Sequence, residues 1–272
     1  MYGAVWDVDN QKVQHIRISM TEYLPAIQGS KYVHSSISRE VFQSIIRDVK
    51  TNKVLFIGTP CQVSAVRNIV GENDNLFCID LVCHGVPSGE MLEKQLKKIT
   101  DENIIELSFR RGTQFILELK DEKGTIYSRD GYDNPYYALF LMFASLRESC
   151  YHCRYAQRSR VGDLTIGDYM EGGKGYSCVL ANAEKGVLLK SLTESVIEYK
   201  ERSVNALMDN VALNHPTARD TRVDAFTKRY NEHGLFHAYY RTFYKLALKR
   251  SLRHLFGDKI YYGIVKRFKS EP

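Results

Sequence analysis

The sequence has no hydrophobic run long enough to cross a membrane and no visible secretory signal. Its longest apolar run covers residues 138–144, whereas a membrane-spanning helix needs about 20 apolar residues. The first residues contain neither a basic segment nor a long apolar one, so we expect a cytoplasmic protein. The 272 residues also contain no internal repeat and no low-complexity tract, which excludes repeat arrays and disordered linkers.

Cysteine is too scarce for a disulfide-stabilised protein, because only six occur in 272 residues. In a reducing cytoplasm, cysteines more often bind metals or carry out redox chemistry than pair with one another. Hydrophobic residues make up 44% of the chain and charged residues 26%, which is ordinary for a globular protein with a core. The six cysteines are therefore candidates for chemistry.

The net charge of +6 is an average over two unlike regions. Residues 221–272 contain 12 of the 38 Lys and Arg residues, only 4 of the 32 Asp and Glu residues, and 11 of the 30 Phe and Tyr residues. This basic tail is expected to be a core-packing helix with a solvated cationic face, or else a surface that docks on an anionic membrane or a partner. Nucleic acid is not expected, because no binding motif accompanies the charge. Its apolar residues recur at roughly helical spacing: Phe236, Tyr240, Phe243, Tyr244, Leu246, Leu248, Leu252 and Phe256.

Two short apolar runs, residues 54–57 and 76–82, are typical of strands buried on both faces of a sheet. A helical pattern separates them, so they are predicted to pair in parallel. The expected fold class is α/β (mixed α+β): a parallel βαβ layer followed by antiparallel strands and a helical C-terminal region. The expected domains are 1–205 and a basic, aromatic extension, 206–272. Further predicted elements are a hairpin at 4–18, helices at 38–49, 88–99, 135–148 and 183–192, and strands at 104–110, 114–120, 125–129, 164–166, 177–180 and 195–199.

Two cysteines follow the predicted parallel strands. Cys61 comes just after the first strand, beyond a tight turn at residues 58–60, and Cys83 ends the second strand. Ligands gather outside the carboxyl ends of parallel strands, so both thiols are expected at one edge of the sheet. Cys61 also opens a helix, where unpaired N–H groups favour a thiolate. Cys78 precedes Cys83 by five residues and is therefore expected to point to the opposite face, as a buried core thiol.

Cys150 and Cys153 form a Cys-x-x-Cys pair at a predicted helix end. Zinc sites, redox dithiols and clusters all use this spacing. Together with Cys61 and Cys83 the pair supplies four thiolates, which suffice for a cubane iron–sulfur cluster or a structural zinc ion. A catalytic cysteine assisted by His84 and a set of unrelated structural cysteines are the alternatives.

Four arginines, Arg147, Arg154, Arg158 and Arg160, surround this pair in the sequence. They form either a solvated basic face or a group beside an anionic cluster or a cofactor phosphate. Both alternatives fit, because arginine is common on exposed surfaces and beside bound anions.

Five motifs occur in a fixed order. They lie at residues 28–35 (Gln-Gly-Ser-Lys-Tyr-Val-His-Ser), 55–62 (Leu-Phe-Ile-Gly-Thr-Pro-Cys-Gln), 80–88 (Asp-Leu-Val-Cys-His-Gly-Val-Pro-Ser), 150–153 (Cys-Tyr-His-Cys) and 162–168 (Gly-Asp-Leu-Thr-Ile-Gly-Asp). Over about residues 1–195 the sequence thereby resembles the coenzyme F-420 hydrogenase/dehydrogenase beta-subunit family.

The resemblance implies an oxidoreductase component that passes electrons between FAD, a 4Fe-4S cluster and a redox partner, such as a ferredoxin or another subunit, or a deazaflavin coenzyme. It implies Cys61, Cys83, Cys150 and Cys153 as cluster ligands. In the implied flavin or substrate pocket, Lys31 would offset negative charge on a reduced ring, although an ordinary surface lysine is the alternative. The cofactor-binding residues implied are Gly29, Ser30, Lys31, Tyr32, Gly58, Thr59, Pro60, Gln62 and His84.

The sequence departs from the family pattern in two places. It has no ferredoxin-like segment rich in Cys-x-x-Cys repeats, and no Ser-Gly-Gly-containing helix before residues 2–4. We therefore expect a shortened or degenerate member, or one that takes part of its flavin site from a partner. Distant relatives often lie beside bacterial polysaccharide-assembly enzymes, which implies a place at the inner face of the membrane. The alternative function is a four-cysteine zinc-binding or degenerate partner-binding module without redox activity.

Overall fold

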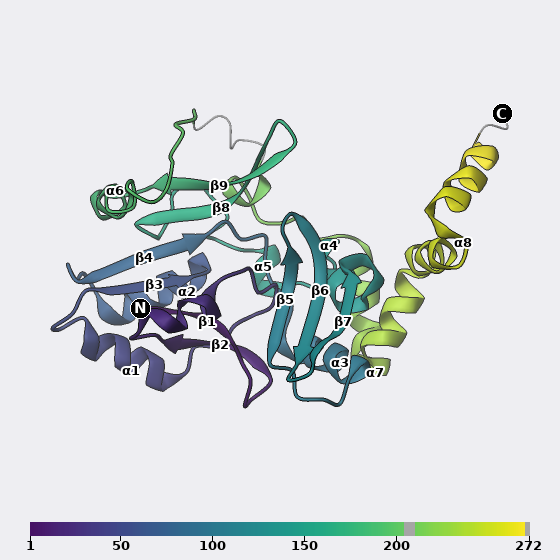
Figure 1. Cartoon of the computed structure of the whole chain (residues 1–272), viewed down its shortest axis with the longest axis horizontal. Helices are drawn as coiled ribbons and strands as arrows, with labels where there is room; N and C mark the ends of the chain where they lie inside the picture. Colours follow the sequence, from purple (N-terminus) through teal and green to yellow (C-terminus); the bar gives the residue numbers. More distant parts are fainter. Residues whose placement is uncertain (204–209, 270–272) are drawn as a thin grey trace.

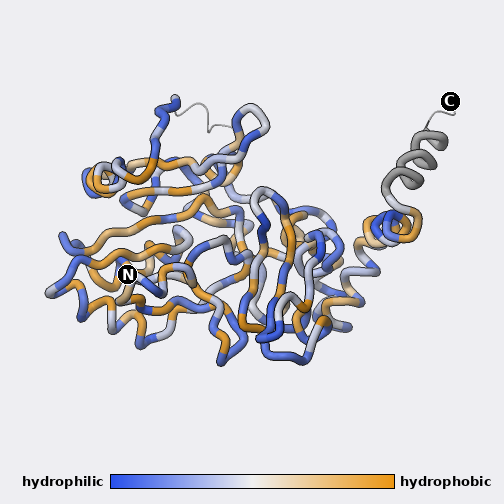
Figure 2. The backbone as a smooth tube through the Cα atoms, viewed as in Figure 1, coloured by the Kyte–Doolittle hydropathy of each residue, from blue (hydrophilic) through white to orange (hydrophobic). Residues whose placement is uncertain are grey.

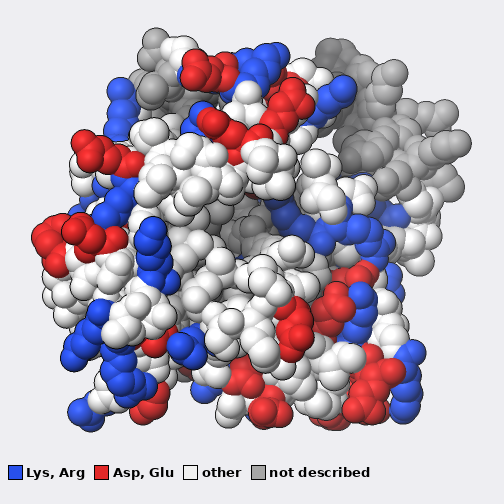
Figure 3. All heavy atoms as spheres, turned by 60° about the vertical axis from the view of Figure 1, so that its left-hand side comes forward, with Lys and Arg blue, Asp and Glu red and all other residues white. Residues whose placement is uncertain are grey.

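The computed structural model describes residues 1–203 and 210–269, and of residues 258–269 only the backbone. Two sheets lie side by side, and the C-terminal helices extend from the smaller one (Figure 1). Lys and Arg side chains are interspersed with Asp and Glu side chains over the face of the molecule in Figure 3. The domain boundary predicted at residues 205 and 206 lies outside the described residues.

The larger sheet has six strands in the order β2-β1-β3-β4-β8-β9. Its four inner strands are mutually parallel, while β2 and β9 run antiparallel to their neighbours at the two edges. The predicted parallel α/β layer is thus confirmed. The strands are β1 (Tyr2–Asp7), β2 (Lys12–Arg17), β3 (Val54–Gly58), β4 (Leu76–Leu81), β8 (Leu164–Glu171) and β9 (Lys174–Ala181).

Two helices, α1 (Arg39–Asp48) and α2 (Pro60–Val70), cover one face of this sheet. Ser38 begins α1, because its hydroxyl accepts the Val41 N–H. Ile45 of α1 and Val63 of α2 pack on the strands with almost no exposed surface. Each fully buried aliphatic side chain of this kind stabilises the fold by about 1.5–3 kcal/mol. A third helix, α6 (Glu184–Ser191), follows β9 and contacts both β8 and β9.

The smaller sheet is inserted in the chain between β4 and β8. It consists of β5 (Glu106–Arg111), β6 (Gln114–Asp121) and β7 (Gly124–Asp130), all antiparallel. The insertion also contains α3 (Gly89–Ile99), α4 (Pro135–Leu141) and the one-turn helix α5 (Glu148–Tyr151). Its core is aromatic and includes the fully buried Tyr136, Tyr137 and Phe109. The chain thus leaves the large sheet near Cys83 and returns to it past Cys150 and Cys153.

Two helices end the chain, α7 (Arg222–Thr242) and α8 (Tyr244–Lys269). The predicted helical C-terminal region is confirmed, but its apolar side chains do not share one environment. Phe226, Leu235 and Phe243 are buried in the core of the insertion, whereas Tyr240 and Leu248 are exposed. Hydrophobic and hydrophilic residues alternate along the first half of α8 (Figure 2). Within the described residues, every helix is too short or too polar to cross a bilayer.

Two predicted elements are wrong. The helix expected over residues 135–148 ends at Leu141, because Phe143 takes a left-handed conformation (φ 54°). Helices often end at a residue in this conformation, and that residue is usually glycine. The apolar run 138–144 contains no glycine to signal this end. The strand expected at residues 195–199 is a turn, since the Val196 and Ile197 N–H groups donate locally to the Thr193 carbonyl.

A buried histidine makes folding stability depend on pH. His15 of β2 stacks on Phe56 and lies 3.1 Å from the Ile57 carbonyl oxygen, and burial lowers its pKa to about 4. The unfolded chain, in which histidine has a pKa of about 6.5, therefore takes up this proton first as the pH falls. The contribution of the neutral His15 to the free energy of unfolding is complete above about pH 6.5. It falls by about 1.4 kcal/mol per pH unit as the pH drops toward 4.

Urea unfolding at pH 7.0, 6.0 and 5.0 measures this dependence. The variant His15→Gln should show a shallower loss of unfolding free energy than the unsubstituted protein. His152→Gln, at an exposed position, is the control and should leave the slope unchanged. Equal slopes for His15→Gln and the unsubstituted protein would contradict the assignment.

Candidate functional site

The four cysteines predicted to act together converge at the carboxyl edge of the large sheet. Cys61 is the second residue of α2, directly beyond β3, and Cys83 follows β4, the parallel neighbour of β3. Burial raises the pKa of the Cys83 thiol to about 12, and the Cys150, Cys61 and Cys153 thiols add to the rise. Burial likewise raises the pKa of Cys150, with Cys61 and Cys153 contributing. The four sulfurs are thus close enough to repel one another as thiolates.

A close backbone approach joins the Cys83 loop to the Cys150 helix. Gly85 has a φ of 109°, and a Cβ there would meet the Cys150 Cβ at 2.9 Å, so only glycine fits without a shift. The Arg147 N–H donates to the Val86 carbonyl at 3.0 Å. The Gly85 N–H donates to the Cys83 sulfur at 3.4 Å, and the Val86 N–H also bonds to the Cys150 sulfur. Backbone amides that point at sulfur favour the thiolate form.

The Cys61 side of the site is fixed by the helix cap of α2. Thr59 and Gln62 form a capping box, in which the Thr59 N–H donates to the Gln62 side-chain oxygen at 3.0 Å. The Gln62 amide then donates to the Ser35 carbonyl and hydroxyl, at 2.9 and 3.0 Å. The Thr59 hydroxyl lies 3.2 Å from the Cys61 sulfur. Gly58 and Pro60 are both buried beside them, so the predicted residues 58–62 form one unit with the segment at residue 35.

A buried ion pair holds the segment that returns from Cys153 to β8. Asp80 of β4 has no exposed surface, and the Arg160 side chain is 1% exposed. Arg160 Nη2 lies 3.0 Å from Asp80 Oδ1, and the guanidinium also donates to the Leu81 and Tyr155 carbonyls. The Thr165 hydroxyl and the Gly162 N–H complete the carboxylate's hydrogen bonds. Of the four arginines near the Cys-x-x-Cys pair, Arg160 is therefore structural, while Arg147, Arg154 and Arg158 are exposed.

The two remaining cysteines, Cys78 and Cys178, are both buried. Cys78 has no exposed surface and packs against α1 and α2, as expected for a core thiol. Burial raises the pKa of its thiol to about 12. Cys178 is 8% exposed, and burial raises its pKa as well.

The predicted residues 29–32 lie on a different part of the same edge. Tyr32 stacks on Phe140 with ring centroids 4.6 Å apart, while Gly29 and Ser30 are exposed. The Lys31 ammonium donates to the Ala26 and Gln28 carbonyls at 3.0 and 2.7 Å. Burial lowers its pKa to about 8, and no carboxylate pairs with it among residues 1–203 and 210–257. The backbone carbonyls of the preceding turn thus hold the Lys31 side chain.

His84 connects the cysteine edge with this second region. Its ring stacks on Phe143 at 5.4 Å, and its carbonyl accepts the Thr217 hydroxyl at 2.6 Å. Burial lowers the pKa of His84, and the nearby Asp168 carboxylate opposes this. Asp168 also influences Tyr32 and forms a 2.8 Å ion pair with Arg110. The histidine is thus part of a junction between the two sheets. Among the described residues, no hydrogen bond joins His84 to a cysteine thiol, as a base for a catalytic cysteine would require.

No three His, Cys, Asp or Glu side chains in the described part of the chain are placed to bind one metal ion together. A single zinc ion requires all its donors about 2.0–2.3 Å from one point. In a cubane cluster each thiolate binds a different iron, so the sulfurs lie further apart. Four thiolate donors are the ligand set of a cubane cluster and also of a structural zinc ion.

A family model confirms the family resemblance that the five sequence motifs predicted. The model for the C-terminal part of the beta subunit of coenzyme F420 hydrogenase/dehydrogenase matches residues 51–204, which is more than half of the chain. This chain belongs to that family. The matched range contains all four clustered cysteines and the Asp80–Arg160 pair.

Solved structures also match this family member. Nine chains do so, among them one from the F420-reducing [NiFe] hydrogenase complex of Methanosarcina barkeri, solved with xenon derivatization. That chain is 16% identical, with a TM-score of 0.48, and the match covers 74% of this chain and 70% of the other. Among proteins with curated functions, none matches significantly.

The F420 beta-subunit motifs contain structural residues that the sequence did not single out. Asp163 accepts the Cys78 N–H at 2.7 Å and pairs with Arg67 at 2.8 Å. The available signal was an aspartate inside each of two apolar strand segments, residues 76–82 and 162–166. A buried carboxylate requires a cation or several donors, but the sequence does not reveal which arginine supplies it.

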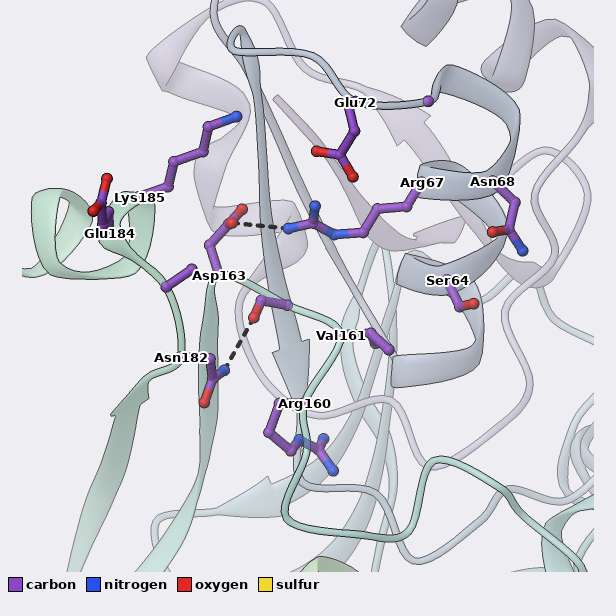
Figure 4. A pocket seen from close by; sticks show the side chains of 13 residues that line it. Ser64, Arg67, Asn68, Glu72, Arg160, Val161, Asp163, Asn182, Glu184 and Lys185 are labelled. Carbon is purple, nitrogen blue, oxygen red and sulfur yellow. Dashed lines mark hydrogen bonds and ion pairs between the residues drawn. The ribbon is translucent and has the colours of Figure 1, made fainter.

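A polar pocket of about 880 Å³ lies beside this second carboxylate, between α2, the loop before β8 and the start of α6 (Figure 4). Arg67 and Asp163 point toward each other across it, and Lys185 approaches from α6. Lys185 is already bonded to the Asn73 and Leu76 carbonyls. None of the predicted cofactor residues lines this pocket, so we do not assign it to the redox site.

Removing Arg160 should destabilise the fold strongly. The variant Arg160→Met leaves the Asp80 carboxylate buried without its cation, which typically costs about 3–5 kcal/mol. Urea unfolding at pH 7 measures the loss. Arg154→Met, on the exposed part of the same segment, should change stability by less than about 0.5 kcal/mol. A loss below about 1 kcal/mol for Arg160→Met would show that the pair does not hold the segment.

Proposed function

We propose that this protein is an electron-transfer component of an oxidoreductase, with a 4Fe-4S cluster bound by Cys61, Cys83, Cys150 and Cys153. The observation that carries the proposal is the convergence of these four thiols from three segments at the carboxyl edge of the sheet. When bound, the cluster would supply one-electron transfer. The chain's own contribution is to orient the thiols and to direct the Gly85 and Val86 amides at two of them.

The chemistry of the donors fits such a group. Burial and repulsion from the neighbouring thiols raise the pKa values of Cys83 and Cys150, which disfavours their free thiolate forms. As cluster ligands the four thiolates would each be paired with positive charge, which would offset this repulsion. Amide hydrogen bonds to sulfur are also one of the features by which proteins set a cluster's reduction potential.

We further propose a flavin or deazaflavin site near Lys31. Lys31 as a whole is half-buried, lacks a carboxylate partner among the described side chains, and precedes Tyr32, whose ring stacks on Phe140. A cation in this position would hold negative charge on a reduced ring. The flavin would couple one-electron and two-electron chemistry. Gly29, Ser30 and His84 would border the ring, and residues 58–62 would link this site to the cluster.

The proposed electron donor and acceptor are protein partners, such as a ferredoxin or another subunit, or a deazaflavin coenzyme. The solved relative belongs to a hydrogenase complex, which supports a partner subunit. A cytoplasmic location at the inner face of the membrane and a link to bacterial polysaccharide assembly remain predictions from the family resemblance alone.

Serine substitutions test the cluster ligands. Protein purified without oxygen should contain about four iron atoms and four sulfides per chain. Cys61→Ser, Cys83→Ser, Cys150→Ser and Cys153→Ser should each lose most of this iron, because serine is a poorer iron ligand. Elemental analysis and sulfide titration measure the content.

Cys78→Ser and Cys178→Ser are the matched controls and should keep the iron. Equimolar zinc without iron would support the zinc-binding alternative. A metal-free protein, or iron loss in Cys78→Ser with retention in Cys83→Ser, would refute the proposed ligand set.

Flavin titration tests the second site separately. Addition of FAD should quench flavin fluorescence, and Lys31→Gln should weaken binding about tenfold or more, since a charge-assisted hydrogen bond is worth about 1.5–3 kcal/mol. Lys53→Gln, at an exposed position on the far edge of the sheet, should bind like the unsubstituted protein. No quenching by FAD or by a deazaflavin would refute this part of the proposal.

A further inference from the structure

The first half of helix α8 has an apolar side that faces away from the protein. Tyr244, Leu248 and Leu255 follow one another at intervals of four and seven residues, so they lie on one face of the helix. Their exposed fractions are 57%, 57% and 75%. Phe256 and Tyr240, at the end of α7, are also exposed. Contiguous exposed apolar side chains of this kind mark an interaction surface.

The opposite side of the helix is fixed to the body. Ala247 packs against the core of the insertion. Arg250 forms ion pairs with Asp133 at 2.5 Å and Asp130 at 2.9 Å, and His254 Nε2 lies 2.9 Å from Asp133. These three residues are spaced by three and four positions, so they share a face distinct from that of Leu248. The apolar face is therefore exposed because the other face is held against the body. Helix α8 itself projects away from the two sheets (Figure 1).

Positive charge borders the exposed apolar face. Lys245 and Lys249 stand next to Tyr244 and Leu248 in the sequence and are exposed. No carboxylate pairs with either lysine among the described side chains. Residues 233–257 contain no Asp or Glu and five Lys or Arg: Arg241, Lys245, Lys249, Arg250 and Arg253.

We propose that this surface, defined by Tyr240, Tyr244, Leu248, Leu255, Phe256, Lys245 and Lys249, docks the protein on an anionic lipid surface. An apolar stripe flanked by lysines, without acidic residues, is the arrangement by which interfacial helices bind such membranes. Tyrosine at the stripe suits the boundary between headgroups and acyl chains. A second copy of the chain is a poorer occupant, because it would bring the same positive charge to the contact. This inference does not depend on the proposed redox function, because vesicle binding requires neither iron nor flavin.

Flotation of the full chain with vesicles tests the proposal. The protein should bind vesicles of phosphatidylcholine with about 30% phosphatidylglycerol, bind pure phosphatidylcholine far more weakly, and be released by high salt. Lys245→Gln with Lys249→Gln should weaken binding about 25-fold, or about fivefold for each lysine. Leu248→Ser with Leu255→Ser should also reduce it at least tenfold.

Two double variants provide matched controls. Lys50→Gln with Lys53→Gln removes the same charge from an exposed site on the other side of the molecule, and Leu192→Ser with Val196→Ser removes exposed apolar side chains elsewhere. Both should bind as the unsubstituted protein does. The proposal would be overturned by equal binding to both vesicle types or by α8 variants that bind like the unsubstituted protein. It would also be overturned if sedimentation showed a dimer that the double variant Leu248→Ser with Leu255→Ser dissociates.

Discussion

The buried pair of Asp80 and Arg160 is the interaction on which the site depends. The chain leaves the large sheet at the end of β4, builds the whole insertion, and must return beside the strand that it left. Arg160 fixes this return, because its guanidinium bonds to Asp80 and to the carbonyls of Leu81 and Tyr155 on both sides of the junction. A buried charge without its partner destabilises the fold strongly. The fold therefore favours the one arrangement in which the Asp80 carboxylate and the Arg160 guanidinium are paired.

The rest of the edge follows from this junction. Once the returning segment is held, α5 lies against the Cys83 loop, and the close approach at Gly85 brings Cys150 to Cys83. Parallel pairing of β3 with β4 adds Cys61 from the next strand end. The four thiols thus come from three segments far apart in the sequence. The insertion also supplies the aromatic side chains around Tyr32, so the same topology builds both proposed cofactor regions side by side.

The sequence predicted the parallel layer well, because strand and helix alternate there with clear hydrophobic periods. The placement of Cys61 and Cys83 at strand ends and the burial of Cys78 followed from the same pattern. The end of α4 was missed, since Phe143 takes a conformation that normally requires glycine. The role of Arg160 was also missed, because four arginines near the Cys-x-x-Cys pair look alike in sequence and only tertiary packing distinguishes the buried one. Lys31 was expected at a cofactor site, but its isolation from carboxylates is a property of the fold alone.

Electron paramagnetic resonance tests the central claim, that these four thiols bind a redox-active cluster, most directly. The protein is purified without oxygen, reduced with dithionite and measured at low temperature. A 4Fe-4S cluster predicts a signal that is absent before reduction and integrates to about one unpaired spin per chain. The Cys83→Ser variant should lose this signal, while Cys78→Ser keeps it. A folded protein that remains silent after reduction and contains zinc or no metal would contradict the account.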